Sequence, residues 1–156
     1  MKLWFRKWIL VLMGAVMVVG AQAADRGTAD EAVALVKKVI VGIKTNGPEK
    51  TFAEINDHAG AKYVSKDLYV FVGSINPGNP TPAHGANLKL VGKVMSELKD
   101  VDGVPFTRMF REVATSKAGK GWVDYKWPDP ITKELVQKST YVERFGDYYV
   151  AAGIYK

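Results

Sequence analysis

The C-terminal part of the chain constrains the fold most, because it contains three strand-like segments joined by short turns. The segments at 121–127, 135–145 and 148–155 are rich in the β-branched and aromatic residues that favour strands. The breaks between them, at 128–130 and 146–147, consist of proline, aspartate and glycine, which are typical of turns. Because short turns join neighbouring strands in opposite directions, this pattern predicts an antiparallel meander.

Two helices are predicted near the beginning of the mature chain. Thr28 and Glu31 have the spacing of a capping box, in which each side chain binds the backbone N–H of the other residue. Apolar residues then recur at helical spacing as far as Ile43, and the break at 46–48 ends the helix. The proline of that break suits the first turn of a second, shorter helix, which we expect to end near 58–60.

The middle of the chain predicts one hairpin and one more helix. Segment 68–75 is dense in Val, Phe and Tyr and predicts a strand, which the turn at 76–80 ends. Segment 81–87 is predicted to return as an irregular edge strand, since it contains a proline and a glycine. Residues 88–98 are expected to form a loop or a short helix. The apolar residues of 106–113 predict a helix that ends at the following Ala-Gly pair.

Five antiparallel strands that are segregated from the helices indicate an α+β fold. The first strand is apolar on both faces, since Tyr69 and Phe71 alternate with Leu68 and Val70. Both faces of the sheet therefore need a cover. We expect the first helix to cover one face and the segment 76–119 to arch over the other, where incompletely filled space would form a pocket.

The first 23 residues are organised like a secretory signal peptide. Three basic residues within the first seven positions precede an apolar stretch at 8–19, and Ala21 and Ala23 are the small residues that a signal peptidase reads. The stretch is shorter than the ~20 residues that span a bilayer. We therefore expect cleavage that leaves Ala24 as the first residue of a single periplasmic domain, 24–156. The alternative is a retained leader that anchors the domain to the membrane.

Composition excludes several classes of function. The chain contains no cysteine, which excludes disulfides, thiolate metal sites and cysteine nucleophiles. Its formal net charge is +6, but the three basic residues of the leader account for half of this value and leave 19 basic against 16 acidic residues. The remaining lysines are scattered, so no nucleic-acid partner is expected.

No catalytic or cofactor-binding motif is present in the sequence. It contains no nucleophile elbow, no glycine-rich phosphate loop and no metal-binding helix motif. Asp57, His58 and His84 could be considered as metal ligands, but their spacing matches no known ligand set. We therefore expect a protein that is not an enzyme and that has neither a cofactor nor a metal.

Three segments carry a resemblance to a known family: LVGKVMSELKDVDGVPFTRMF at 90–110, GWVDYKWPDP at 121–130 and KSTYVERFGDYYVAAGIY at 138–155. They resemble the single Cache domains, which are extracytoplasmic sensor modules with a PAS-like fold. The resemblance implies a long N-terminal helix on a five-stranded antiparallel sheet, with a small organic anion such as a short carboxylate bound on the opposite side. Members usually lie between two membrane spans of chemoreceptors or sensor kinases. No second apolar span follows here, so we expect a free-standing periplasmic sensor that contributes to signal transduction or chemotaxis through a membrane-bound receptor or kinase partner.

Residue chemistry and the resemblance together suggest ligand-binding residues. His84 has the position of the family's motif histidine, although Gly85 follows where the family tends to have proline. Arg108 offers a planar fork for a carboxylate, and its alternative is a surface pair with a glutamate four residues later. Tyr125 and Trp127 share one face of their strand and could form an aromatic wall or simply belong to the core.

Lys138, Ser139 and Tyr141 complete the candidate set. Strand alternation puts Ser139 and Tyr141 on one face and Lys138 on the other. The preceding turn leaves the register open, and a slip of one residue exchanges the faces. All three therefore remain candidates.

Two other functions remain open at this point. The same fold could serve as a structural or interaction module that binds a membrane kinase or transporter without a ligand of its own. An unrecognised hydrolase that uses His84 is the third possibility.

Overall fold

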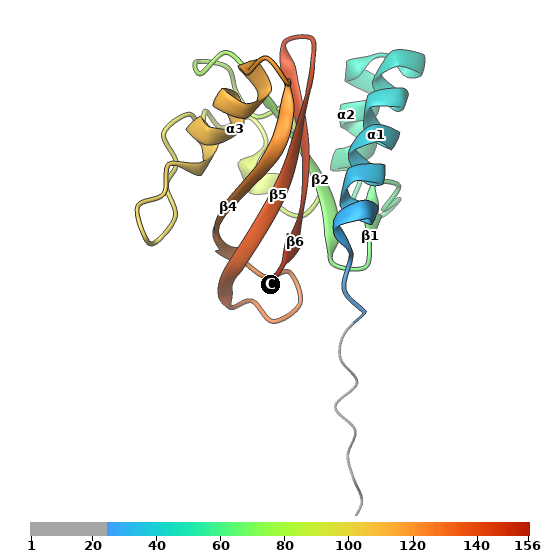
Figure 1. Ribbon diagram of the computed structural model, residues 1–156. Coiled ribbons are helices and arrows are strands. Elements are labelled where there is room, and N and C mark those ends of the chain that lie inside the picture. The colour runs from blue at the N-terminus through green and yellow to red at the C-terminus, as the bar shows by residue number, and fades with distance from the viewer. Residues whose placement is uncertain (1–24) are drawn as a thin grey trace, which may run out of the picture.

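The computed structural model describes residues 25–156, and these residues form a sheet with helices on both faces (Figure 1). Helices α1 and α2 lie against one face, and α3 lies against the other. Among residues 25–156, no helix combines the length and the apolar character needed to cross a bilayer. The predicted signal peptide and its cleavage residues Ala21, Ala23 and Ala24 lie outside the described residues.

The two N-terminal helices are confirmed. Helix α1 comprises Ala29–Asn46, and the predicted capping box is present. The Glu31 backbone N–H donates to the Thr28 hydroxyl over 3.2 Å, and the Glu31 carboxylate accepts from the Thr28 N–H over 2.8 Å. Gly47 follows with a φ of 83°, a left-handed conformation that glycine adopts without strain. Helix α2 comprises Pro48–Asn56 and therefore ends slightly earlier than the expected 58–60.

All strand pairs of the sheet are antiparallel, and its order is β1-β2-β6-β5-β4, with β3 paired to β2 at one edge. The strands are β1 (Val64–Ser65), β2 (Leu68–Ser74), β3 (Ala83–His84), β4 (Lys120–Pro128), β5 (Leu135–Phe145) and β6 (Tyr148–Tyr155). The predicted meander is therefore confirmed. The structure has the five expected strands and, in addition, the two-residue strand β1. The edge strand expected at 81–87 shortens to β3, because Pro82 has no N–H to contribute to the pairing.

The segment 76–119 crosses the second face, as expected. It contains the short 3-10 helix η1 (Leu88–Leu90) and the helix α3 (Phe106–Thr115), which ends before the expected Ala-Gly pair. The loop ahead of α3 is tied to the helix, since the Thr107 hydroxyl donates to the carbonyl oxygens of Ser96 and Leu98. These bonds hold the loop over the sheet.

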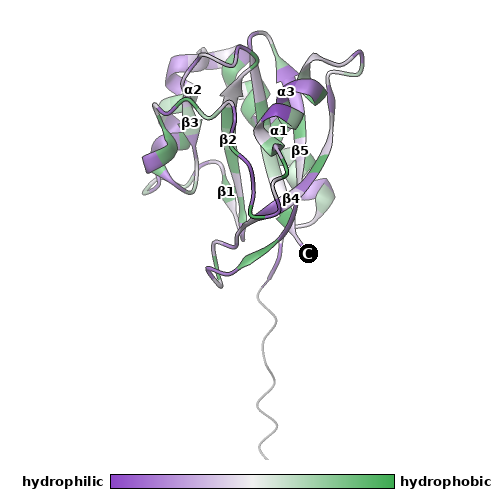
Figure 2. Ribbon diagram, turned by 90° about the vertical axis from the view of Figure 1, so that its left-hand side faces the viewer, coloured by the Kyte–Doolittle hydropathy of each residue, from purple (hydrophilic) through white to green (hydrophobic). Residues whose placement is uncertain are grey.

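Each face of the sheet has a hydrophobic core of its own. One core lies between the sheet and helices α1 and α2, and the other lies between the sheet and α3. Every residue of β2 is buried, which agrees with the prediction that both faces are covered. Figure 2 shows hydrophobic residues along the central strands, whereas the outer surfaces of the helices are more hydrophilic.

Candidate functional site

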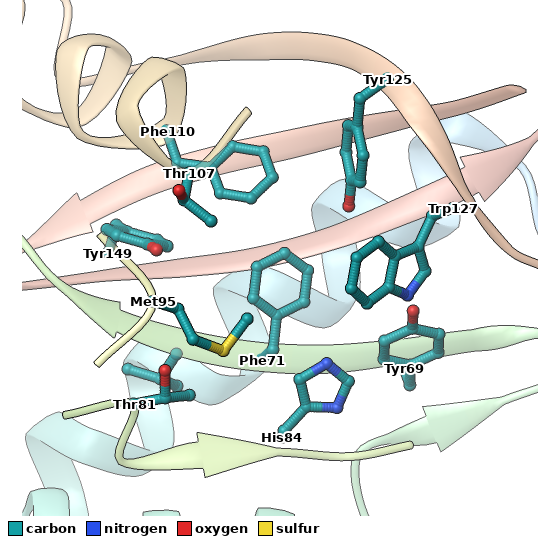
Figure 3. A pocket seen from close by; sticks show the side chains of 11 residues that line it. Tyr69, Phe71, Thr81, His84, Met95, Thr107, Phe110, Tyr125, Trp127 and Tyr149 are labelled. Carbon is teal, nitrogen blue, oxygen red and sulfur yellow. The ribbon is translucent and has the colours of Figure 1, made fainter. Parts of the chain in front are cut away.

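Two adjoining cavities lie on the α3 side of the sheet. The inner cavity has a volume of about 30 Å³, and the outer one has a volume of about 220 Å³. Tyr69, His84 and Trp127 line both cavities and therefore stand at the boundary between them. Half of the remaining residues of the inner wall are aromatic and come from β2, α3, β4 and β6, and their side chains point toward one another (Figure 3).

Hydrogen bonds fix the tautomer of His84. Its Nδ1 accepts from the backbone N–H groups of Ala86 and Asn87, over 3.2 and 3.0 Å. A ring nitrogen that accepts hydrogen bonds carries no proton, so the proton of the neutral ring lies on Nε2. His84 therefore presents a single N–H donor through Nε2.

The surroundings of His84 keep its ring uncharged. The side chain is buried and stacks on Phe71 with ring centroids 5.6 Å apart. Burial and the neighbouring positive charges of Lys138 and His58 lower the pKa of His84 to about 3. The imidazole is consequently neutral at physiological pH. It can offer a hydrogen bond to an anion, but it does not titrate in the range expected of an ordinary histidine.

Lys138 lies fully buried on β5, on the same side of the sheet as the cavities. Its Nζ donates to the hydroxyl oxygens of Tyr69 and Tyr155, over 2.7 and 3.2 Å, and it lies 4.0 Å from the centroid of the Tyr69 ring. Among residues 25–156, no ion pair includes Lys138. Burial lowers the pKa of Lys138 to about 7, because the charged form loses its hydration.

Two nearby carboxylates oppose this lowering of the pKa of Lys138, but both carboxylates form ion pairs with Arg26. Asp67 and Asp129 raise the pKa of Lys138 through their negative charges. The Arg26 guanidinium contacts Asp67 over 3.1 Å and Asp129 over 2.6 Å. Arg26 thus neutralises part of the negative charge near the lysine and joins the beginning of β2 to the β4–β5 loop.

The aromatic residues expected from strand β4 line the inner cavity. Tyr125 stacks on Phe106 with ring centroids 4.4 Å apart, and its hydroxyl accepts from Thr140 over 3.1 Å. The indole nitrogen of Trp127 points toward the Tyr69 hydroxyl (Figure 3). Tyr125 and Trp127 therefore belong to the core and to the cavity wall at once.

The strand register separates the three candidates on β5. Lys138 faces the cavities, whereas Tyr141 packs in the core beneath α1 and its hydroxyl donates to Glu143. Ser139 points to the same side as Tyr141 and donates to Asp124. Neither Ser139 nor Tyr141 lines either cavity, so we exclude both from the candidate site.

Arg108 also lies away from the cavities. Its side chain is 55% exposed, and its Nε lies 3.6 Å from a carboxylate oxygen of Glu112. The structure thus shows the alternative that the sequence left open, a surface pair of residues four apart on α3, and we do not include Arg108 in the candidate site. The helix directs its apolar side, which includes Phe106 and Phe110, toward the sheet, so the arginine points to solvent.

Several residues of the site were missed by sequence reasoning. Tyr69 and Phe71 were assigned to an apolar strand face, although the hydroxyl of Tyr69 was a signal that this face is not purely apolar. Arg26 and Asp67 were not considered, because nothing in the sequence pairs residues 41 positions apart. Among residues 25–156, no cluster of three or more potential metal ligands occurs. His58 instead contacts the backbone oxygen of His84 over 3.1 Å.

Comparisons with known proteins agree with this architecture. The family model described as "Cache domain" matches residues 29–156. No curated protein is similar enough to count as a match. A Cache chemosensory domain, solved to explain carboxylic acid recognition, is similar with a TM-score of 0.65 and 25% identity, over 81% of this chain and 91% of that one.

Two further solved structures have the same fold. A periplasmic sensor domain of a chemotaxis protein is 21% identical, with a TM-score of 0.61 over 81% of this chain and 88% of that one. A methyl-accepting chemotaxis protein from Vibrio parahaemolyticus is 20% identical, with a TM-score of 0.62 over 81% of this chain and 86% of that one. Because the family model matches most of the chain, from α1 to the last residue, this chain belongs to the Cache domain family.

Proposed function

We propose that this chain is an extracytoplasmic sensor domain that binds a short organic acid, as its carboxylate, on the α3 side of the sheet. The observation that supports this most directly is the convergence of three polar groups where the two cavities adjoin. These are the Nε2–H of His84, the hydroxyl of Tyr69 and, bonded to that hydroxyl, the buried Nζ of Lys138. A similar Cache chemosensory domain that recognises carboxylic acids supports the same ligand class.

The two ends of a short acid would meet different parts of the site. The His84 imidazole and the Tyr69 hydroxyl can donate to the carboxylate oxygens, and the charge of Lys138 lies directly behind Tyr69. The apolar tail would enter the inner cavity against Phe71 and Phe110. That cavity, at about 30 Å³, has room for roughly two water-sized groups. This size favours acids with a tail of one or two carbons.

The leader and the family support the cellular setting of this proposal. The signal-peptide pattern at 1–23 would export the chain and release the domain 24–156 into the periplasm. Membership of a sensor family favours recognition over catalysis. We propose that a membrane-bound receptor or kinase partner reads the ligand-bound state.

A thermal-shift screen followed by calorimetry tests the ligand class. Acetate, propionate, lactate and pyruvate are compared with hexanoate, and we expect stabilisation by one or more of the short acids but not by hexanoate. Tyr69→Phe should weaken binding of the best acid about 10- to 100-fold, because hydrogen bonds to charged groups contribute about 1.5–3 kcal/mol.

Arg108→Ala serves as the matched control, because Arg108 lies outside both cavities. This variant should bind as the unmodified domain does. A flat thermal response to all the short acids would contradict the proposal, and so would equal losses in Tyr69→Phe and Arg108→Ala.

A further inference from the structure

Lys138 is a titratable group that lacks an anionic partner within bonding distance in the part of the chain that the structure describes. The side chain is fully buried, and its Nζ donates only to two neutral hydroxyl groups among residues 25–156. Asp67 and Asp129, the carboxylates that act on it through space, contact Arg26 instead. The ammonium form of this lysine is thus poorly compensated by the protein groups around it.

The tyrosine and histidine side chains around Lys138 are uncharged at neutral pH. Tyr69 from β2, Tyr125 from β4 and Tyr155 from β6 all have a pKa raised above its ordinary value by burial, so these phenols keep their protons. His84 from β3 is neutral because its pKa is lowered to about 3. With Asp67 and Asp129 bound to Arg26, Lys138 is the group in this cluster that can change its charge near neutral pH.

The hydroxyl of Tyr69 connects this lysine to the cavities. Tyr69 lines both cavities, whereas Lys138 lines neither. The Tyr155 hydroxyl donates its proton to the Pro128 carbonyl over 3.0 Å, so it can accept from Lys138. Tyr69 accepts from Lys138, and it donates its own proton to the Tyr155 hydroxyl oxygen, 3.1 Å away. A ligand carboxylate is the stronger acceptor for that proton, because hydrogen bonds to an ionised group are stronger than neutral ones.

We propose that Lys138 takes up a proton from solvent when a carboxylate binds, so that the domain binds an acid and a proton together. This inference rests on the proposed function. An anion that accepts from Tyr69 places a negative charge one hydrogen bond away from Nζ and favours the ammonium form. Lys138 therefore acts through Tyr69 as a positioning residue, and no covalent bond changes. Affinity should be greatest below about pH 7 and should fall as the pH rises above it.

Calorimetry of the unmodified domain tests the inference without any variant. Propionate is titrated at pH 6 in phosphate and in bis-Tris, and at pH 8 in phosphate and in Tris, since the two buffers of each pair differ in their heats of ionisation. At pH 8 we expect an uptake of about 0.5–1 proton per propionate bound, and at pH 6 close to none, because the lysine is then already charged. The affinity should fall by up to about tenfold per pH unit above pH 7.

Substitutions on the two faces of β5 identify the group that takes up the proton when propionate binds. Lys138→Arg carries a permanent charge and should bind propionate without proton uptake at pH 8. Lys138→Met should bind weakly at both pH values and take up no proton. Ser139→Ala, on the opposite face of the same strand, should behave like the unmodified domain.

The outcomes separate this inference from the proposed function. Binding of propionate at pH 8 with equal heats in both buffers would overturn the inference and leave the proposed function intact. Proton uptake that persists in Lys138→Arg would also overturn it, since the proton would then go to another group. A lack of propionate binding at both pH values would overturn the proposed function and this inference together.

Discussion

The two faces of the sheet are built from alternate residues of the same strands, yet they are packed with different kinds of side chain. On β2, Leu68, Val70 and Val72 point toward α1 and α2, whereas Tyr69 and Phe71 point toward α3. The first core is mainly aliphatic. The second core is mainly aromatic and has His84 and Lys138 at its border.

Under the proposed function, this difference in side-chain chemistry assigns stability and binding to opposite faces of the sheet. Aliphatic side chains carry no polar atoms and can fill a core densely. Aromatic rings are rigid, and the hydroxyl of a buried tyrosine requires a hydrogen-bond partner. On the α3 side some of these rings meet edge to face, and both cavities lie on this side of the sheet. We infer that the α1 face mainly stabilises the fold and that the α3 face gives up some stability to form a site.

The largest effect is expected from a truncation on the aliphatic face. Ile40→Ala removes a side chain of α1 that is only 7% exposed, and it should lower the free energy of unfolding by about 2–5 kcal/mol, as buried isoleucine truncations do. Chemical denaturation measures this loss. The affinity of the folded fraction for a short acid should not change. A change in that affinity would mean that the two faces are not separate in function.

Lys138→Met, on the other face of the sheet, should raise the free energy of unfolding instead of lowering it. The lysine must be buried uncharged or must lose its hydration, so methionine should stabilise the ligand-free domain by about 1–3 kcal/mol at pH 6. The pKa of Lys138 is lowered to about 7 in the folded state from an unfolded value near 10.5. The unfolded chain therefore binds more protons between these values, and the stability of the unmodified domain rises with pH across this window.

Denaturation curves from pH 6 to 10 measure the difference in the free energy of unfolding between Lys138→Met and the unmodified domain. The advantage of Lys138→Met should be largest below pH 7 and should shrink toward pH 10, because the folded-state lysine is neutral above its pKa of about 7 while the unfolded-state lysine loses its proton only near 10.5. Parallel curves for the two proteins across this range would show that Lys138 does not titrate there.

The fold could be predicted largely from local patterns. The capping box at Thr28, the proline at 48 and the turn at 146–147 each determine backbone geometry through neighbouring residues, and the elements they bound are present as expected. The two-residue strand β1 could not be predicted, because two residues carry no periodicity. Helix α2 ends earlier than the expected 58–60, because helix ends vary by one or two residues.

The site was harder to predict because it depends on register and on distant contacts. The alternation of β5 separated Lys138 from Ser139 and Tyr141 correctly, but the direction of each face depended on a turn that the sequence did not define. The bridge from Arg26 to Asp67 and Asp129 joins three separate parts of the chain. Only the folded backbone brings these charges together.

The smallest effect is expected at Arg108, and it tests whether the site is confined to the cavities. The side chain is more than half exposed, and within 25–156 its one ion-pair partner is Glu112, at 3.6 Å. Pairs of this kind contribute about 0.2–0.5 kcal/mol on a helix surface. Arg108→Ala should therefore change the free energy of unfolding by less than about 0.5 kcal/mol, and double-mutant cycles with Glu112→Ala should account for the change. Because both partners are solvated, ~1 M salt should remove most of this coupling. If Arg108→Ala instead weakened the binding of a short acid tenfold, α3 would have to rotate or shift to bring the arginine to the ligand, and the border between the binding face and the solvent would lie farther out than these cavities indicate.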